Sequence, residues 1–514
     1  MKRILFSLVI AFTTIGFTKA QIAEDALRFS QYLYGGTSRS MAMGNAFGAL
    51  GGDFTSLSIN PAGIGVYRSS EFVFTPVFNY SLVNSTYLGQ SYEDFDYNLK
   101  VNNIGFVSTY SGSNSGFVNV NFGIGYNRLR NFDRNLTFLG NNAPHSLLDE
   151  FAYNANVGDG SAYYEDLAFN TYLIDYTEDF DNDLALIDHA QMKYLGVLDD
   201  LGVYFSEYDY EEVYGSGALY GQNQEININT TGNIGEYTFS LGANYEHKLY
   251  MGATVGIQRL YYKEVKDHYE FDDVNNFNLD YFKFHENFET RGTGYNLKAG
   301  IIGRPINMLR ISAAVHTPTF YNLESEFYTS ADAYYDQPPY DDLDETNYYD
   351  RSELLISDYK LVTPFRAIGS VGITLKDKGL ISVDYEFADY GNARFRGDDT
   401  QGFNRENEVI QNIARITHNL RAGGEILFGP LALRGGYSFY ASPYAENELN
   451  DDANYSIISG GFGVRTEGFF FDMAVLHNTH PEKRFLYWAY DDSRVIADAD
   501  MKKISVSATL GFRF

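Results

Sequence analysis

The chain has 514 residues, no cysteine and a formal charge of −29, together with 44 tyrosines, 40 phenylalanines and 48 glycines. The lack of cysteine excludes a disulfide framework, thiol catalysis and thiolate metal sites, and the acidic balance excludes binding to nucleic acid through its phosphates. So many aromatic residues and glycines are typical of the interface girdles and the curved sheet of a membrane-spanning β-barrel.

The first 20 residues are typical of a signal peptide. Lys2 and Arg3 precede an apolar run over residues 4–16, and the segment ends in the small residue Ala20. The apolar run is too short to span a bilayer. We therefore expect residues 1–20 to direct export and the mature chain to begin at Gln21.

Residues 21–68 do not alternate as strands do, and we expect them to form a compact hatch. The segment is rich in small residues and glycine and closes on Asn60, Pro61 and Ala62. Pro61 fixes one backbone torsion, Asn60 can hydrogen-bond to its neighbouring backbone, and glycines permit close approach to a wall. The alternative is a simple turn that leads into the first strand.

Residues 69–514 predict an all-β fold, a transmembrane antiparallel β-barrel of about 14 strands whose lumen the hatch plugs. The segment 223–245 is interpreted as one long strand, although Thr230 to Gly235 could divide it. Tight turns are expected at one end of the barrel, at residues 112–115, 246–248, 304–307, 376–379, 429–430 and 466–468. Longer acidic or aromatic stretches separate the strands at the other end, which predicts that the long loops lie outside the cell.

The last strand gives the clearest pattern. From Lys503 onward, polar and apolar residues alternate as far as the terminal Phe514. One face then carries only apolar residues, namely Ile504, Val506, Ala508, Leu510, Phe512 and Phe514. Such a strand is typical of the closing strand of a transmembrane barrel, and an edge strand of a β-sandwich is the alternative.

Residues 141–221 interrupt the strand pattern. Apolar residues between Asp183 and Leu201 fall near helical spacing. Because a structureless loop of this length would be unusual, we expect a partly helical external lid. Its apolar face would either capture hydrophobic ligands or pack the lid onto the barrel rim.

Charged residues on neighbouring strands point toward the lumen near the end of the chain. Opposite charges at such positions can form a ladder that holds the hatch, and ordinary lumen polarity is the alternative. The predicted ladder consists of Arg366, Asp384, Glu386, Arg421, Glu425 and Arg434.

The hatch segment resembles that of the FadL/TodX family of outer-membrane transport proteins. The resemblance rests on the Gly-punctuated run over residues 38–48 and on the Asn-Pro-Ala motif at residues 60–62. Residues 123–128 resemble the family's third strand, and the Thr-Pro pairs within residues 316–318 and 363–366 match in position. The resemblance covers nearly the whole mature chain.

This resemblance implies a route for the ligand. In the family, ligand passes from an external groove to a site near the hatch and leaves sideways at a kink in the third strand. The resemblance places that kink near Gly123 or Gly125, where a bulge would be permitted. Ordinary barrel glycines are the alternative interpretation.

We therefore expect a monomeric channel in the cell outer membrane for passive uptake of hydrophobic small molecules, either fatty-acid-like or aromatic. Its expected partners are membrane lipid, lipopolysaccharide and the ligand, with no nucleic acid, cofactor or metal. The acidic external loops would repel carboxylates, which leaves the substrate open. Two alternatives are a binding or shuttling component of a secretion system and an outer-membrane hydrolase. The hydrolase has little support because His477 and His480 do not form a clean metal pair and no nucleophile elbow occurs.

Overall fold

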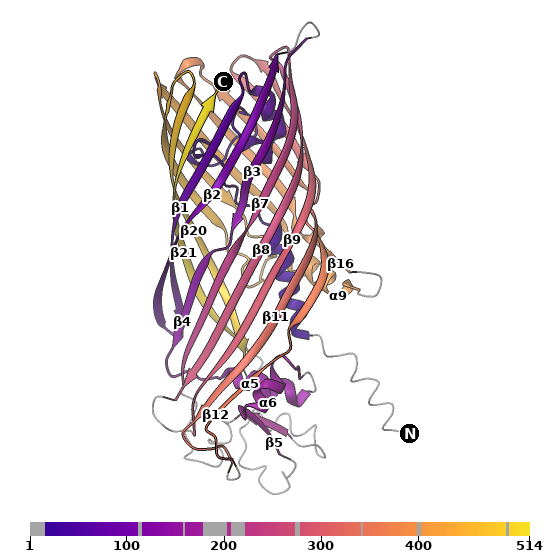
Figure 1. Cartoon of the computed structure of the whole chain (residues 1–514), viewed down its shortest axis with the longest axis vertical. Helices are drawn as coiled ribbons and strands as arrows, with labels where there is room; N and C mark the ends of the chain where they lie inside the picture. Colours follow the sequence, from indigo (N-terminus) through magenta and orange to yellow (C-terminus); the bar gives the residue numbers. More distant parts are fainter. Residues whose placement is uncertain are drawn as a thin grey trace.

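The computed structural model describes residues 16–111, 116–157, 160–177, 203–206, 222–272, 278–340, 343–397, 402–489 and 493–514. Their strands close into a tall antiparallel barrel with helical segments inside the lumen (Figure 1). Closure occurs where the first strand pairs with the last, from Glu71 opposite Arg513 to Thr86 opposite Asp498. The predicted all-β barrel and its hatch are confirmed.

Nineteen strands of the described residues belong to the barrel sheet. They are β1 (Glu71–Tyr87), β2 (Gln90–Ser111), β3 (Phe117–Asn131), β4 (Arg134–Gly140), β7 (Asn223–Tyr245), β8 (Leu249–Phe271), β9 (Leu279–Ile306), β10 (Leu309–His316), β11 (Phe320–Tyr335), β12 (Asn347–Arg351), β13 (Leu355–Val362), β14 (Arg366–Thr374), β15 (Gly379–Asp389), β16 (Arg394–Arg396), β17 (Ile416–Phe428), β18 (Leu431–Tyr440), β19 (Tyr455–Arg465), β20 (Phe469–Trp488) and β21 (Arg494–Arg513). Some consecutive segments pair with the same neighbouring strand and together form one strand of the wall, as β3 and β4 do along β7. The wall therefore has 14 strands in the described chain.

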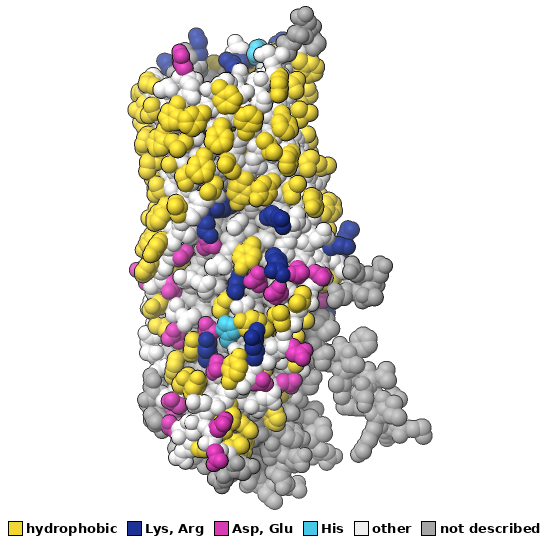
Figure 2. Space-filling model, viewed as in Figure 1, with side chains coloured by type: hydrophobic (Ala, Val, Ile, Leu, Met, Phe, Trp, Pro, Cys, Tyr) yellow, Lys and Arg dark blue, Asp and Glu magenta, His cyan; other side chains and the backbone are white. Residues whose placement is uncertain are grey.

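The alternation of side chains divides the wall into an inner and an outer face. In β21, Ile504, Leu510 and Phe512 are exposed on the outside, whereas Ser507 and Thr509 are buried inside. Figure 2 shows that such apolar side chains form a belt over one half of the barrel, while charged side chains are scattered among other side chains over the other half. The apolar half is the part of the wall that can lie in a bilayer.

Short turns gather at the belt end of the barrel, where the carboxy-terminus lies (Figure 1). Turns at residues 246–248, 429–430 and 466–468 lie where the sequence predicts them, and the turn expected at 304–307 lies at 307–308 because β9 extends to Ile306. Residues 112–115 lie outside the described chain. None of the described helices is long and apolar enough to span a membrane.

The long strand β7 spans Asn223–Tyr245 without a break, so the prediction of one strand is confirmed. The break lies instead in its neighbour, between β3 and β4, where the ladder passes from Asn131 opposite Asn233 to Arg134 opposite Thr230. There the Gly232 N–H donates to Asp133 Oδ1 at 2.9 Å, so a side chain replaces the missing ladder contact.

The hatch occupies the lumen with four helical segments, α2 (Gly16–Ser30), α3 (Ser38–Ala42), α4 (Ser56–Ile59) and the 3₁₀-helix η2 (Pro61–Val66). Most described hatch side chains are buried. Helix α2 begins before the expected cleavage point, and residues 1–15 lie outside the described chain, so cleavage after residue 20 stays a prediction.

The opposite end of the barrel carries the lid region, with α5 (Leu147–Val157), α6 (Glu165–Asn170) and a separate two-stranded sheet of β5 (Ile174–Thr177) and β6 (Val203–Ser206) (Figure 1). The helix predicted over residues 183–201 lies outside the described residues. Helix α9 (Asn404–Ile413) lies between the lid and the belt (Figure 1), and the 3₁₀-helix η4 (Tyr390–Asn392) joins β15 to β16. The 3₁₀-helix η3 (Lys376–Lys378) forms the turn between β14 and β15 that the sequence predicts at residues 376–379.

Candidate functional site

The Asn-Pro-Ala motif forms the start of η2. Asn60 is the residue before the helix, and its Oδ1 accepts a hydrogen bond from Ala62 N at 3.1 Å. Its Nδ2 donates to Gly48 O at 2.7 Å, which ties the two halves of the hatch together. Pro61 occupies the first helical position, where its missing N–H costs nothing. The motif therefore stabilises the hatch from within.

Glycines of the wall allow the motif to approach closely. A Cβ at Gly300 would overlap Asn60 Oδ1, and a Cβ at Gly252 would overlap Pro61 O. Ala62 is fully buried against Tyr250 on the same wall. The hatch thus rests directly on the backbone of β8 and β9.

Gly123 and Gly125 serve the same purpose on β3. Both are regularly paired with β2, Gly123 opposite Val107 and Gly125 opposite Gly105. A Cβ at Gly123 would lie 2.8 Å from Leu57 Cδ2, and one at Gly125 would lie 2.5 Å from the ring of Phe54. The pairing of β3 with β7 shifts register between Arg128 and Arg130. A lateral opening at these glycines stays a prediction.

The structure divides the six predicted ladder residues into two clusters. In the first, Glu386 forms ion pairs with Arg366 and with Arg421, each at 2.9 Å, and Arg421 lies 3.7 Å from Asp384. Asp384 accepts a hydrogen bond from Gly48 N at 2.9 Å, so this cluster grips the hatch backbone. All four wall side chains are buried.

Hatch aromatic residues complete the first cluster. The Tyr34 hydroxyl donates to Glu386 Oε2 at 3.3 Å, and the Arg421 guanidinium lies 5.1 Å from the Tyr34 ring centroid. The Arg366 guanidinium lies 4.2 Å from the Tyr32 ring centroid and donates to Ser30 O. Charge and aromatic contacts therefore hold the segment after α2 against β14, β15 and β17.

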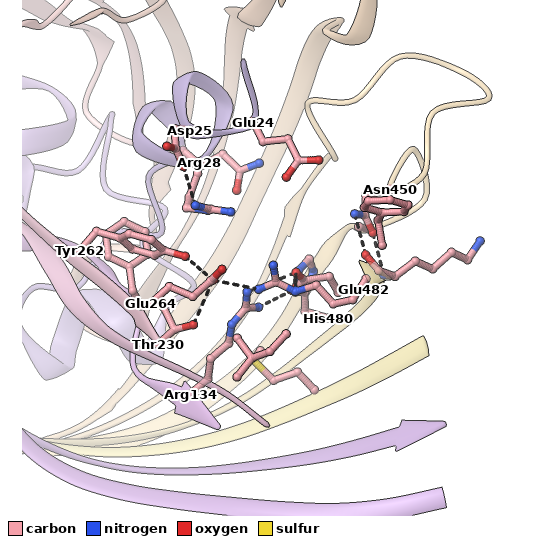
Figure 3. A pocket seen from close by; sticks show the side chains of 18 of the residues that line it. Glu24, Asp25, Arg28, Arg134, Thr230, Tyr262, Glu264, Asn450, His480 and Glu482 are labelled. Atoms are coloured by element: carbon pink, nitrogen blue, oxygen red, sulfur yellow. Dashed lines mark hydrogen bonds and ion pairs between the residues drawn. The ribbon is translucent and has the colours of Figure 1, made fainter. Parts of the chain in front are cut away.

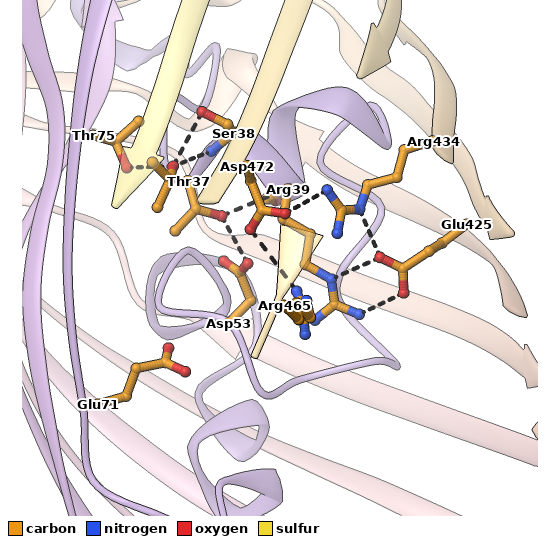
Figure 4. A network of polar contacts seen from close by, with 12 residues as sticks. Thr37, Ser38, Arg39, Asp53, Glu71, Thr75, Glu425, Arg434, Arg465 and Asp472 are labelled. Atoms are coloured by element: carbon orange, nitrogen blue, oxygen red, sulfur yellow. Dashed lines mark hydrogen bonds and ion pairs between the residues drawn. The ribbon is translucent and has the colours of Figure 1, made fainter. Parts of the chain in front are cut away.

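The second cluster contains Glu425 and Arg434 (Figure 4). Arg434 contacts Glu425 and Asp472, each at 2.6 Å. Arg39 of α3 donates two hydrogen bonds to Glu425, at 3.0 and 3.2 Å, so the hatch supplies one of the two cations that contact Glu425. Because removing one partner of a buried ion pair costs about 3–5 kcal/mol, the pair between Arg39 and Glu425 strongly disfavours departure of the hatch.

A third contact lies on the other side of the lumen, and the sequence did not single it out. Lys298 forms an ion pair with Glu236 at 2.5 Å, and Ser58 donates to Glu236 at 2.7 Å. His316 Nε2 lies 2.8 Å from Ile59 O. The available signal was the inward position of each charged residue in its alternating strand, but alternation cannot identify a partner on another strand.

A cavity of about 810 Å³ lies between the hatch and the lid. One part of its lining is apolar and comes from lid and wall side chains, including Leu147, Phe151, Tyr164, Phe284, Phe288 and Phe327. Another part is charged and comes from α2, β4, β8 and β20 (Figure 3). A cavity of this size and mixed lining suits an amphipathic small molecule.

The charged lining is a connected network (Figure 3). Glu482 forms ion pairs with Arg134 and with Arg484, the latter at 2.9 Å. Arg484 also lies 3.6 Å from Glu264. On α2, burial raises the pKa of Asp25 to about 7, although the neighbouring Arg28 opposes this effect. The network was not predicted.

Three cations at the edge of the cavity lack such partners. Arg130 donates to Gln31 Oε1 at 2.5 Å and to the Tyr455 hydroxyl at 3.2 Å, and Arg128 donates to Val101 O at 2.7 Å. Neither these arginines nor Lys503 forms an ion pair with any described residue. This edge of the cavity therefore has an excess of positive charge.

The barrel wall is interrupted next to these cations. The β2–β3 ladder ends at Asn103 opposite Asn127, and beyond it β4 pairs only with β7 among the described strands. Side chains span the interval instead, including an ion pair between Lys100 and Asp133 at 2.9 Å. Asn102, beside the end of the ladder, lines the cavity. Side chains are easier to move than a ladder of backbone hydrogen bonds.

The lid closes the far end of the cavity through apolar contacts and two buried carboxylates. Phe151 of α5 packs against Phe284 of β9 with ring centroids 5.0 Å apart. Glu150 accepts a hydrogen bond from Trp488 N at 2.8 Å, and Glu165 accepts one from Ser161 N at 2.7 Å. Burial raises the pKa of Glu150 and of Glu165 to about 7. Within the described residues, no three His, Asp or Glu side chains gather as metal ligands.

These features define a membrane-spanning β-barrel that is plugged by its own amino-terminal segment. Neither a protein-family profile nor a sequence comparison with curated proteins finds a match. In structure, the chain is similar to a Pseudomonas aeruginosa FadL homologue, with a TM-score of 0.54, 12% identity and coverage of 94% of this chain and 100% of that one. It is also similar to the Pseudomonas putida toluene transporter TodX, with a TM-score of 0.51, 10% identity and coverage of 94% and 100%. This chain therefore has the FadL/TodX-like fold.

Proposed function

We propose that this protein is an outer-membrane channel for the passive uptake of hydrophobic small molecules that carry a polar group. The observation that carries the proposal is the cavity enclosed between the lid and a hatch held by buried ion pairs. The similarity in fold to a toluene transporter and to a FadL homologue supports it. The short turns would face the periplasm and the long loops the outside, as in other barrels of this type.

The proposed path of the ligand follows from which contacts hold firmly and which can separate. A ligand would enter past the lid and rest with its apolar part against the aromatic wall. The two charged clusters and the contact at Glu236 hold the hatch in place. The side-chain contacts between β2 and β4 are therefore a more favourable exit than the centre of the lumen. The register shift at Arg128 and Arg130 adjoins this exit, whereas Gly123 and Gly125 would support it from the paired part of β3.

The unpaired cations give the cavity a preferred ligand charge. Arg128, Arg130 and Lys503 would attract the anionic end of an amphipathic ligand, such as a carboxylate, once it has passed the acidic loops. Since these cations lie deep inside the barrel, the loop charge would slow the encounter of an anion without removing its binding site.

The proposal can be tested by uptake into proteoliposomes of three probes that share one alkyl chain, namely decanoate, decanol and decyltrimethylammonium. We expect the wild type to admit decanoate and decanol faster than empty liposomes do. Lys503→Gln should lower decanoate uptake at least fivefold and leave decanol uptake unchanged. Lys502→Gln, on the exposed outer face of the same strand, is the matched control. Uptake no faster than in empty liposomes for every probe would refute the channel function.

A further inference from the structure

The outer surface of the belt contains a groove that the transport route does not use. It lies over β3, β7, β8, β9 and β10 and has an almost wholly apolar lining. Its floor is a pair of cross-strand neighbours with small side chains, Ala253 and Ala299. Larger side chains flank the floor on the same face, namely Phe122, Leu241, Leu297 and Val315.

Cross-strand pairing shows what lies above the groove toward the long-loop end. One step along from the floor, Val255 lies between Phe239 and Leu297, and in the next row Ile257 lies between Tyr237 and Tyr295. Aromatic side chains are enriched at the membrane interface. The following row contains Arg259, whose neighbours are the small residues Gly235 and Thr293. The Tyr126 ring lies over Gly235, and the small Thr293 side chain lies on the other side of Arg259.

The spacing of these rows matches one leaflet of a bilayer. Arg259 is six residues from Ala253 on β8, so the two lie about 20 Å apart along the strand. With a strand tilt of about 45°, that separation is about 14 Å along the membrane normal, close to half the hydrocarbon thickness of about 30 Å. The floor then lies near the middle of the bilayer and Arg259 lies at the level of the headgroups.

The charge of Arg259 is not neutralised by the protein. Among the described residues, its Nη1 donates to Thr293 Oγ1 at 3.3 Å and the guanidinium forms no ion pair. The neighbouring cations on this face are compensated, since Arg291 contacts Glu324 and Glu326 at 2.5 and 2.8 Å. Figure 2 shows positive side chains at the edge of the apolar belt on this face.

We propose that this face binds one molecule of lipid A, with an acyl chain in the groove over Ala253 and Ala299 and a phosphate on Arg259. The inference rests on the proposed outer-membrane location, because the long-loop end of the strand then faces the leaflet that carries phosphorylated glycolipid. A phosphate is the expected partner of an uncompensated arginine at an interface. A second barrel fits less well, because its convex wall would touch the flanking rings and leave the floor empty.

The test is retention of lipid A by the purified full chain, measured by native mass spectrometry after titration in detergent. We expect one retained lipid A per barrel for the wild type. Arg259→Gln removes the charge and Ala299→Phe fills the floor, so each should lower retention at least fivefold. The matched controls are Arg291→Gln, which removes a compensated cation, and Ala422→Phe, which adds the same ring to the outer face of β17; both should retain lipid A as the wild type does.

Equal retention in the wild type, Arg259→Gln and Ala299→Phe would overturn the proposal. The proposal would also be overturned if phosphatidylglycerol were retained with the same affinity and its retention fell equally in these variants. The site would then bind any anionic lipid. Decanoate and decanol uptake should be unchanged in both variants, since the groove faces away from the lumen. Failure of lipid binding is thereby separated from failure of the channel function.

Discussion

The backbone N–H of Gly48 donates to both carboxylate oxygens of Asp384, at 2.9 Å to Oδ2 and 3.2 Å to Oδ1. The carboxylate belongs to the wall and the N–H to the hatch, so a single charged side chain joins the two. Asp384 is itself near Arg421, which also pairs with Glu386. The position of the hatch therefore depends on a buried charge balance rather than on apolar packing alone.

Replacing Arg421 tests this dependence. In Arg421→Gln, Glu386 keeps Arg366 but Asp384 loses its nearby cation, so we expect the hatch to be destabilised by about 3–5 kcal/mol. Single-channel recording in planar bilayers should then show a higher leak conductance than the wild type. Arg291→Gln, which removes an exposed ion pair outside the lumen, should leave the leak unchanged. An unaltered leak in Arg421→Gln would contradict the anchoring role.

The Asn60 side chain offers a finer test, because its two polar atoms have separate tasks. Asn60→Ala removes all three hydrogen bonds of the side chain, including the long one to Ile301 O, and should destabilise the hatch by about 1–2 kcal/mol. Asn60→Asp keeps the acceptor for Ala62 N but loses the donor to Gly48 O, so its effect should be larger than a lost bond alone because a buried charge is added. Hydrogen exchange of the Ala62 amide should be faster in Asn60→Ala than in the wild type. High ionic strength should not slow this exchange again.

Phe54 lies against glycines of the wall, and this contact can be examined with a double-mutant cycle. A Cβ at Gly105 would overlap the Phe54 ring, so Gly105→Ala should destabilise the protein by about 1–3 kcal/mol. Phe54→Ala should cost about 3–5 kcal/mol through the cavity it leaves. In the double variant the new methyl group enters that space. The destabilisation of the double variant should therefore be smaller than the sum of the two single destabilisations.

Thermal unfolding of the reconstituted barrel measures all three variants. Gly369→Ala is the control, because a Cβ at Gly369 meets nothing within 4 Å. Strictly additive costs would mean that Phe54 and Gly105 do not compete for the same space, and the close approach of hatch and wall would then be wrong.

The wall of the barrel was predictable from the sequence because a single rule governs it. Each strand separates lipid from lumen, so its residues must alternate, and the pattern from Ile504 to Phe514 shows the outer face directly. The same rule placed Arg366 and Arg421 on the inner face. It could not show that Arg434 belongs to a second cluster with Arg39, because that contact crosses from the wall to the hatch.

The cavity and the wall interruption were not predictable for a related reason. Both depend on where ladders stop, and the stop between β2 and β3 leaves no mark in the alternation of either strand. The glycines at 123 and 125 were recognised as unusual, but the sequence does not show that Leu57 and Phe54 of the hatch lie against them. Contacts between segments distant in the chain are invisible to local pattern.

The lid should respond to pH through Glu150 and Glu165. The folded pKa of each is about 7 against an ordinary value of 4.5, so each docked carboxyl holds its proton more tightly than it does when solvated. Docking is therefore strongest below about pH 4.5, weakens as the pH rises through the interval up to about 7, and stays at the weaker level above it. The lid should open more readily at neutral than at acidic pH.

Trp488 provides the measurement, because it is the only tryptophan in the sequence and its backbone N–H donates to Glu150. Its fluorescence should change between pH 4.5 and 7 in the wild type. Glu150→Gln keeps an acceptor for that N–H but cannot ionise, so most of the change should disappear, and Glu165→Gln should reduce it less. Asp166→Asn, on the exposed side of the same helix as Glu165, should behave as the wild type. A pH response that persists in Glu150→Gln combined with Glu165→Gln would show that other groups control the lid.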